Sequence, residues 1–131
     1  MQIRDFVNKN YNYALVGATT NQNKYGYTVL KDLAGAGYNI VGVNPHHQEI
    51  DDVPVYPTLK DVPQKPDVVI FVVPPKVGVK ILDEVATLGI KKVWFQPGAE
   101  SEAVRTRAAK LGLAAQADGS CIMVARRMAG F

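Results

Sequence analysis

The sequence predicts a three-layer α/β protein, with about five mainly parallel strands in a doubly wound sheet and a single domain over residues 1–131. Two observations predict this fold. Short β-branched apolar runs recur along the chain, and the segments between them have apolar residues at helical spacing. Strands that alternate with helices build βαβ units, and right-handed crossovers then leave a doubly wound sheet as the simplest topology.

Five apolar runs are expected to form the strands. They are continuous rather than alternating, which is typical of parallel strands that helices cover on both faces. The runs are Ala14–Val16, Tyr38–Val43, Val68–Val73, Val93–Phe95 and a weaker one at Leu113–Ala117.

Three segments between these runs are expected to be helices, each ending near a glycine. They are Tyr25–Ala36, the segment from Val77 to Leu88 and Ser101–Leu111, where Ser101 is the N-cap or lies just inside the helix. A short helix is also expected within Gln2–Asn10. The proline-rich stretch 44–66 is predicted to be a surface connection with at most a short helix around Thr58–Val62. Together these elements predict a Rossmann-type sheet.

Composition narrows the classes of partner. The net charge of +3 comes from 15 basic and 12 acidic residues that are scattered along the chain, so we expect no nucleic-acid partner. The single cysteine, Cys121, cannot form an internal disulfide, and no Cys and His cluster has metal-ligand spacing. The chain start lacks the pattern of a secretory signal, and the longest apolar run is too short to span a bilayer. We therefore expect a cytoplasmic protein with no membrane partner.

The loop after the first strand, in VGATTNQNKYGY, is the first candidate ligand site. Ligands of open parallel sheets bind beyond the carboxyl ends of the strands, where the strand order reverses. Gly17 allows a tight turn, and a polar loop leads into a helix whose first N–H groups favour a phosphate. Lys24 adds a positive charge. The loop is not the G-x-G-x-x-G fingerprint, because Thr19 stands where the second glycine would be.

The second strand ends in VGVNPHH, where NAD-binding chains usually carry a carboxylate for the ribose hydroxyls. Asn44 has no charge, which suits a phosphorylated ribose such as that of coenzyme A and equally that of NADP. Pro45 fixes the local backbone. His46 and His47 are expected to be solvated, with a phosphate contact by one of them as the alternative.

The third and fourth strands end in further turns at the same edge. Pro74 and Pro75 start the next helix and also offer a flat apolar wall to an adenine or a pantetheine arm. Gln96 lies in a polar turn after the fourth strand, and Trp94 is expected in the core. Cys121 follows the last predicted strand, where a buried free thiol is expected and a redox role is the alternative.

Together these motifs resemble the family of small stand-alone CoA-binding proteins, whose domain is similar to the CoA-binding domain of the succinyl-CoA synthetase alpha subunit. The resemblance runs from Tyr13 to Val124 and rests on VGATTNQNKYGY, IVGVNP, EIDDVPVYPTLKDVP, DVVIFVVPP, KKVWFQPGA and CIMV, in this order and spacing. It implies binding of coenzyme A or a short acyl-CoA through the nucleotide. No catalytic constellation is visible, which favours a binding, sensing or carrier module over an enzyme.

The resemblance also implies a set of site residues. The first loop would line the phosphates, the end of the second strand would flank the adenosine, the third strand would face the nucleotide or pantetheine, and Gln96 would close the site. No catalytic or metal residue is predicted. The cofactor-binding residues are Gly17, Ala18, Thr19, Thr20, Asn21, Gln22, Lys24, Tyr25, Val43, Asn44, Pro45, His47, Val73, Pro74, Pro75 and Gln96.

One departure from the family and two alternative functions stay open. The synthetase has a coenzyme-contacting lysine shortly after the proline of the second loop, whereas this chain has His46 and His47, so Lys24 is the candidate for that charge. The chain is too short for the synthetase's phosphorylated histidine and ATP-grasp partner. The alternatives are an NADP-dependent oxidoreductase or its degenerate relative, and a CoA-site subunit of a separately encoded acyl-CoA synthetase. A homodimer or a ligase subunit is the protein partner to test.

Overall fold

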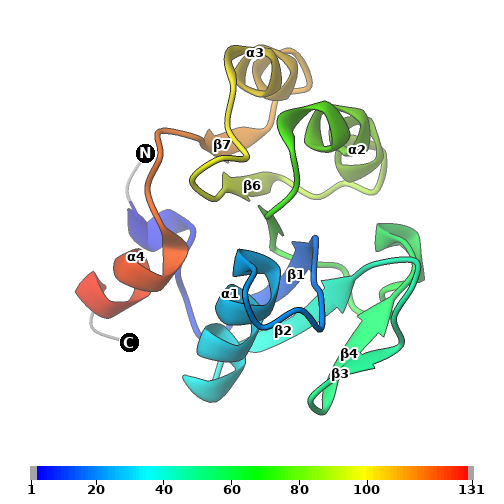
Figure 1. The fold of residues 1–131 in the computed structure, drawn as a ribbon. Helices are drawn as coiled ribbons and strands as arrows, with labels where there is room; N and C mark the ends of the chain where they lie inside the picture. Colours follow the sequence, from blue (N-terminus) through cyan, green and yellow to red (C-terminus); the bar gives the residue numbers. More distant parts are fainter. Residues whose placement is uncertain (1–2, 130–131) are drawn as a thin grey trace.

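A seven-stranded sheet forms the centre of the computed structural model, which describes residues 3–129 (Figure 1). The strand order is β3-β4-β2-β1-β5-β6-β7. All neighbours pair in parallel except β3 and β4, which are antiparallel. The strands are β1 (Asn12–Val16), β2 (Asn39–Val43), β3 (Glu49–Ile50), β4 (Val53–Tyr56), β5 (Val68–Phe71), β6 (Lys92–Phe95) and β7 (Ala114–Gln116).

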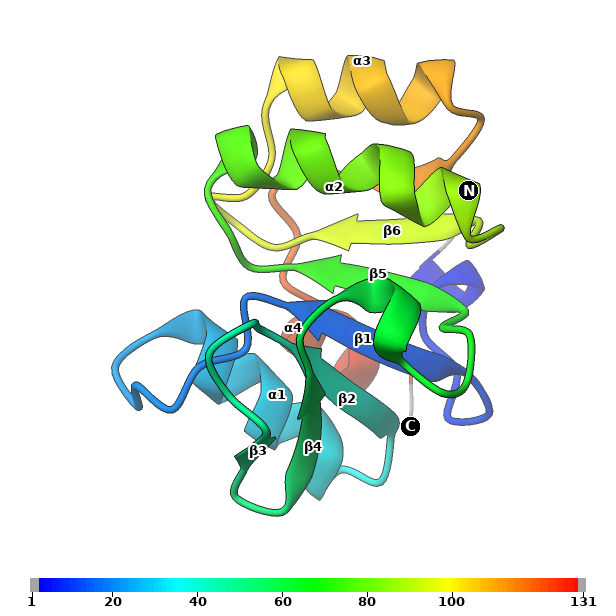
Figure 2. The same ribbon diagram turned by 90° about the vertical axis from the view of Figure 1, so that its right-hand side faces the viewer.

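Helices cover both faces of this sheet, α1 and α4 on one side and α2 and α3 on the other (Figures 1 and 2). This arrangement confirms the doubly wound α/β fold. No helix within residues 3–129 has the length and apolar character needed to cross a membrane. The helices are α1 (Tyr25–Gly35), α2 (Pro75–Thr87), α3 (Glu102–Lys110) and α4 (Ile122–Met128), with short 3₁₀ turns η1 (Ile3–Asp5) and η2 (Leu59–Asp61).

The pleat of the central strands explains their continuous apolar sequence. In β1, Tyr13 and Leu15 pack into the core beneath α1 and α4, whereas Ala14 and Val16 pack into the core beneath α2 and α3. Because successive side chains point to opposite faces and both faces are covered, all positions from Tyr13 to Val16 are buried. The five predicted strands are confirmed as β1, β2, β5, β6 and β7.

The β3–β4 hairpin corrects the prediction that residues 44–66 are only a surface connection. The hairpin extends the sheet from about five strands to seven, and only η2 matches the short helix expected there. Its turn places Asp51 and Asp52 at φ values of 46° and 72°, the left-handed pair that a type I′ hairpin needs. Two aspartates are a weak signal for such a turn, which usually carries Asn-Gly. The strands themselves are too short to stand out in the sequence.

Helix α4 is a second element that the sequence does not predict, and it follows the last predicted strand, Leu113–Ala117. The helix has only seven residues, and packing rather than propensity holds it. Ile122 and Ala125 are buried in the core, and Arg126 forms a two-pronged ion pair with Asp32 of α1 at 2.8 and 2.9 Å. The ion pair links α4 to α1 across 94 positions of the sequence, so local patterns could not reveal it.

Several local predictions hold. Ser101 is the N-cap of α3, since its hydroxyl accepts a hydrogen bond from the Val104 N–H at 3.2 Å. Pro75 occupies the first position of α2, and Trp94 is fully buried. The helix expected within Gln2–Asn10 is the 3₁₀ turn η1, with Gln2 lying outside the described residues.

Candidate functional site

The strand order reverses between β1 and β5, and a crevice opens there at the carboxyl ends of the strands. The chain leaves β1 toward β2 on one side and returns through β5, β6 and β7 on the other. Val72, just after β5, donates its N–H to the carbonyl of Val16 at 2.9 Å, which keeps the two strand ends together. Gly17 follows directly, so the first predicted loop lies at this reversal, the usual ligand position in such sheets.

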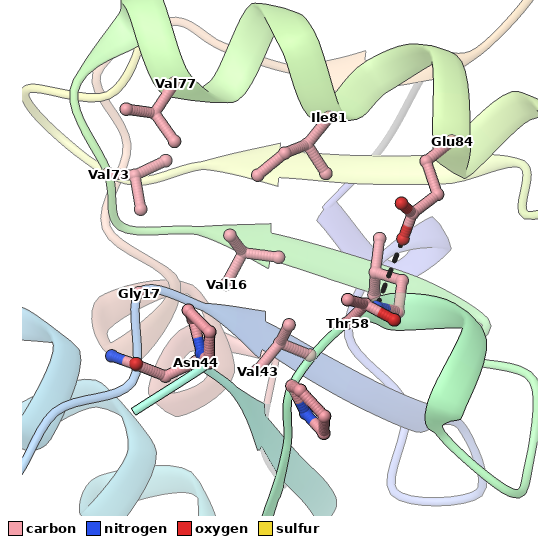
Figure 3. A pocket seen from close by; sticks show the side chains of 12 residues that line it. Val16, Gly17, Val43, Asn44, Thr58, Val73, Val77, Ile81 and Glu84 are labelled. Atoms are coloured by element: carbon pink, nitrogen blue, oxygen red, sulfur yellow. Dashed lines mark hydrogen bonds between the residues drawn. The ribbon is translucent and has the colours of Figure 1, made fainter. Parts of the chain in front are cut away.

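A pocket of about 230 Å³ extends from this crevice beneath α2 (Figure 3). Val77 and Ile81 approach it from α2, while Val16 and Val43 lie on the sheet side. Gly17 and Asn44 lie at one end of the pocket, and Thr58 and Glu84 lie at the other. The full lining is Val16, Gly17, Val43, Asn44, Pro45, Pro57, Thr58, Leu59, Val73, Val77, Ile81 and Glu84.

Two glycines bring the first loop and the start of α1 into contact. Gly17 has φ +102°, and a β-carbon there would lie 2.3 Å from the carbonyl oxygen of Val72. A β-carbon on Gly26 would lie 2.0 Å from the carbonyl oxygen of Gly17. No larger residue fits either position without a backbone shift. Gly26 therefore provides the close helix–strand packing that the last glycine provides in dinucleotide-binding loops.

The loop between Gly17 and α1 is organised by its own side chains. The Thr19 hydroxyl accepts from the Asn21 N–H at 3.2 Å, and the Asn21 side chain accepts from the Asn23 N–H at 3.0 Å. Within residues 3–129, the N–H groups of Thr19, Thr20 and Gly26 have no protein acceptor. Unpaired amides at the start of an 11-residue helix form a suitable cradle for an anion.

Asn44 joins the first loop to the end of β2. Its side-chain nitrogen donates to the Ala18 carbonyl at 2.8 Å, and its side-chain oxygen accepts from the His46 N–H at 2.8 Å. The Asn44 backbone N–H also donates to the Tyr56 carbonyl at 2.9 Å, which ties in the end of β4. Asn44 is thus both a wall of the pocket and the residue that fixes the spacing between two of its loops.

A carboxylate lies at the other end of the pocket. Glu84 of α2 accepts a hydrogen bond from the Leu59 N–H at 3.1 Å, so it caps the start of η2 (Figure 3). The Thr58 hydroxyl donates to the Asp61 side chain at 2.7 Å, a second hydrogen bond that stabilises η2. The pocket therefore has Gly17 and Asn44 at one end, an acidic side chain at the other and mainly apolar walls between them.

The structure brings together only part of the predicted site. Gly17, Val43, Asn44, Pro45 and Val73 line the pocket. Ala18 is buried behind the loop, and the loop residues Thr20, Asn21, Gln22, Lys24 and Tyr25 are exposed, with Thr19 partly so. His47 is half-buried beside Asn44, whose carbonyl accepts its N–H at 3.5 Å. Pro74 and Pro75 form the N-cap and first residue of α2 and do not line the pocket.

Gln96 lies apart from the pocket and holds α4 instead. The side chain is fully buried, its oxygen accepts from the Ile122 N–H at 2.7 Å, and its nitrogen donates to the Cys121 sulfur at 3.3 Å. Both atoms of this amide are therefore hydrogen-bonded at the start of α4, and the side chain does not line the pocket. Cys121 is partly exposed rather than buried.

Sequence reasoning missed much of the far half of the pocket. The β4–η2 segment contributes Pro57, Thr58 and Leu59, which had been assigned to a surface connection. Helix α2 contributes Val77, Ile81 and Glu84, a segment that the sequence predicts only as a helix. A glycine opening a helix after a strand is a recognisable signal, so Gly26 could have been identified. Nothing local marks Glu84, whose role depends on η2 folding back against α2.

Comparisons with known proteins identify the family of this domain. A family profile described as "CoA binding domain" matches residues 11–127. An ADP-forming acetate–CoA ligase of Methanocaldococcus jannaschii is 33% identical over 92 residues, which are 67% of this chain and 13% of the ligase. This chain therefore spans about an eighth of that relative's length.

Two solved structures are similar in fold. A conserved hypothetical protein from Pyrococcus furiosus is 46% identical with a TM-score of 0.82, and the match covers 87% of this chain and 97% of that one. A dinucleotide-forming acetyl-coenzyme A synthetase from Ca. Korarchaeum cryptofilum, solved with phosphate and ADP, is 26% identical with a TM-score of 0.74. That match covers 85% of this chain and 26% of the synthetase. The same domain is thus similar both to a short protein and to part of a much longer one.

Proposed function

The chain belongs to the CoA-binding domain family, and from that premise we propose that it binds coenzyme A or a short acyl-CoA through the nucleotide moiety. The pyrophosphate would lie against the N–H groups of the 17–26 segment. The base would enter the pocket under α2, with the phosphorylated ribose near Asn44. Residues 1–131 would act as one module that stores, senses or presents the coenzyme.

The observation that carries this proposal is the arrangement of groups around the strand reversal, with hydrogen-bond donors in the loop that follows Gly17 and apolar walls along most of the pocket. The N–H groups of Thr19, Thr20 and Gly26, which have no protein acceptor within residues 3–129, and the positive end of α1 follow Gly17 along the chain and favour an anion there. The remaining walls are mainly apolar and suit a flat base. Lys24, exposed at the N-cap of α1, would add a positive charge to the phosphate end. His47 would lie at the rim on the β2 side.

Direct titration tests the proposal. Calorimetry with coenzyme A and, in parallel, with NADP should show saturable binding of coenzyme A with the lower Kd. Both ligands carry adenine and a phosphorylated ribose, so the comparison separates the leading function from the oxidoreductase alternative. Stronger binding of NADP would overturn the coenzyme assignment.

Thr19→Asp tests where the phosphates lie. An aspartate can still accept the Asn21 N–H, so the loop keeps its turn while a carboxylate enters the phosphate position. We expect coenzyme A affinity to fall at least about tenfold, or ~1.4 kcal/mol. Thr106→Asp, on the exposed side of α3, is the matched control and should bind like the unmodified protein. Unchanged affinity in a folded Thr19→Asp variant would show that the phosphates do not bind at this loop.

A ligase-subunit role is the second candidate, because the ligases that resemble this chain contain it as a small part of their length. In that case the module would deliver coenzyme A to a separately encoded acyl-CoA synthetase subunit. Purification from native cells at low salt should then recover a ligase polypeptide in fixed ratio with this chain. Recovery of this chain alone, still carrying coenzyme A, would favour the stand-alone module.

A further inference from the structure

We propose that Glu84 is the residue that selects the base, by accepting a hydrogen bond from the exocyclic amine of adenine. The inference rests on the proposed function and deepens it. It assigns to one side chain the discrimination between a 6-amino purine and a 6-oxo purine in the nucleotide that enters the pocket.

The charges of the pocket determine which end of a nucleotide meets Glu84. The unpaired N–H groups belong to the loop and helix start that follow Gly17, and Gly26 packs against the Gly17 carbonyl. A carboxylate lies at the opposite end of the pocket, where a phosphate would be repelled. Glu84 follows Val77 by seven residues along α2, which at 1.5 Å per residue corresponds to about 10 Å. This length is comparable with that of a nucleoside measured from its 5′ oxygen to the far edge of the base. A nucleotide anchored by phosphate at Gly17 would therefore present its base edge to Glu84.

One carboxylate oxygen of Glu84 already accepts a hydrogen bond, and the other can accept one from a ligand. One carboxylate oxygen accepts the Leu59 N–H at 3.1 Å, and the other has no protein partner in the part of the chain that the structure describes. The bond to Leu59 fixes the side chain in place, so the second oxygen is an oriented acceptor and not a mobile surface charge (Figure 3). Such an acceptor matches an N–H donor and opposes a carbonyl oxygen.

The apolar walls next to Glu84 do not distinguish one flat base from another. Val43, Leu59 and Ile81 are apolar side chains that contact any flat ring equally well. Adenine presents an amine at the position where hypoxanthine and guanine present a carbonyl oxygen. A site with one oriented acceptor rejects the second group because the acceptor and the carbonyl repel each other and neither is hydrogen-bonded.

The test uses coenzyme A and its deaminated analogue, in which hypoxanthine replaces adenine. The unmodified protein should bind coenzyme A at least about tenfold more tightly than the analogue in calorimetric titration. Glu84→Gln keeps an oxygen for the Leu59 N–H and replaces the free acceptor by an amine donor. We expect this variant to lose about tenfold in affinity for coenzyme A and to bind the analogue as well or better. Glu102→Gln, exposed on α3, is the control for loss of one negative charge.

The outcomes separate two claims, base selection by Glu84 and binding of coenzyme A by the chain. Equal affinities of the unmodified protein for coenzyme A and the analogue overturn the role of Glu84 while leaving coenzyme A binding intact. This result would also be expected if the pantetheine arm filled the pocket. Binding of neither ligand overturns the proposed function itself. Since the unmodified protein alone gives these results, they hold even if Glu84→Gln does not fold.

Discussion

Replacing Asn44 by aspartate perturbs the pocket at the point where its two loops are joined. The Asn44 side chain donates to the Ala18 carbonyl at 2.8 Å and accepts from the His46 N–H at 2.8 Å. Aspartate preserves the second bond but has no N–H for the first. An ionised carboxylate would instead face the Ala18 carbonyl oxygen, so the first loop and the end of β2 should separate.

The structure sets the expected size of the effect on stability. Leaving a partly buried carbonyl without its donor costs about 1–3 kcal/mol. For a chain of this length each kcal/mol lowers Tm by roughly 3–5 °C. The protonated acid can again donate to Ala18, so the folded pKa of the new carboxyl should be raised above its unfolded value. The destabilisation should therefore be full at neutral pH and should decrease as the pH falls below about 5.

Ligand affinity should fall as well, because the new charge lies beside the expected phosphate positions. Two like charges about 10 Å apart repel by about 1–2 kcal/mol at an effective dielectric constant of ~20, or roughly tenfold in Kd. The assay is thermal unfolding at several pH values together with coenzyme A titration. Asn39→Asp, at the opposite end of β2 and about 16 Å away, is the control and should alter neither quantity much. A folded Asn44→Asp variant as stable and as tight-binding as the unmodified protein would refute this account.

Three further predictions concern other contacts. Gly26→Ala should destabilise the protein by about 1–3 kcal/mol in chemical denaturation and weaken coenzyme A binding, because the new β-carbon would meet the Gly17 carbonyl. Gly35→Ala in the same helix is the control, since a β-carbon there has open space and should be neutral or stabilising. Tyr13→Phe removes a hydroxyl that donates to the Phe6 carbonyl at 2.6 Å and accepts from the Asn8 N–H at 3.0 Å, and should cost about 1–3 kcal/mol. In contrast, the buried Tyr38 hydroxyl has no partner within residues 3–129, so a Tyr38→Phe variant that loses as much stability would contradict the reasoning. Finally, the Tyr27 hydroxyl bonds Asp51 at 2.5 Å, which lowers the pKa of Asp51 and raises that of Tyr27. The lowered folded pKa of Asp51 contributes stability that is lost as the pH falls, and the raised folded pKa of Tyr27 contributes stability that is lost as the pH rises. The stability difference between the unmodified protein and Tyr27→Phe should therefore be largest between about pH 5 and pH 9 and should shrink on both sides. A difference that does not vary with pH would exclude this coupling.

Much of the near half of the pocket could be predicted because it depends on chain order. Gly17, Val43, Asn44 and Val73 all follow or end a buried parallel strand, and the carboxyl ends of such strands meet at one edge. Gln96 also follows a buried strand, but its amide bonds Cys121 and Ile122 and the residue does not line this pocket. Position along the chain determines which edge a residue reaches, whereas hydrogen-bond partners determine where its side chain turns.

The sequence by itself determined the doubly wound arrangement, the helix starts at Pro75 and Ser101 and the position of the polar loop before α1, because each depends on local spacing or backbone chemistry. The tertiary structure alone decided the β3–β4 hairpin, helix α4 and the acidic end of the pocket. Short elements are stabilised mainly by contacts with distant residues, as Asp32 holds Arg126 and Glu84 holds the start of η2. Contacts between residues 25 or more positions apart leave no periodic signal in the sequence, because they form only when the helices pack on the sheet.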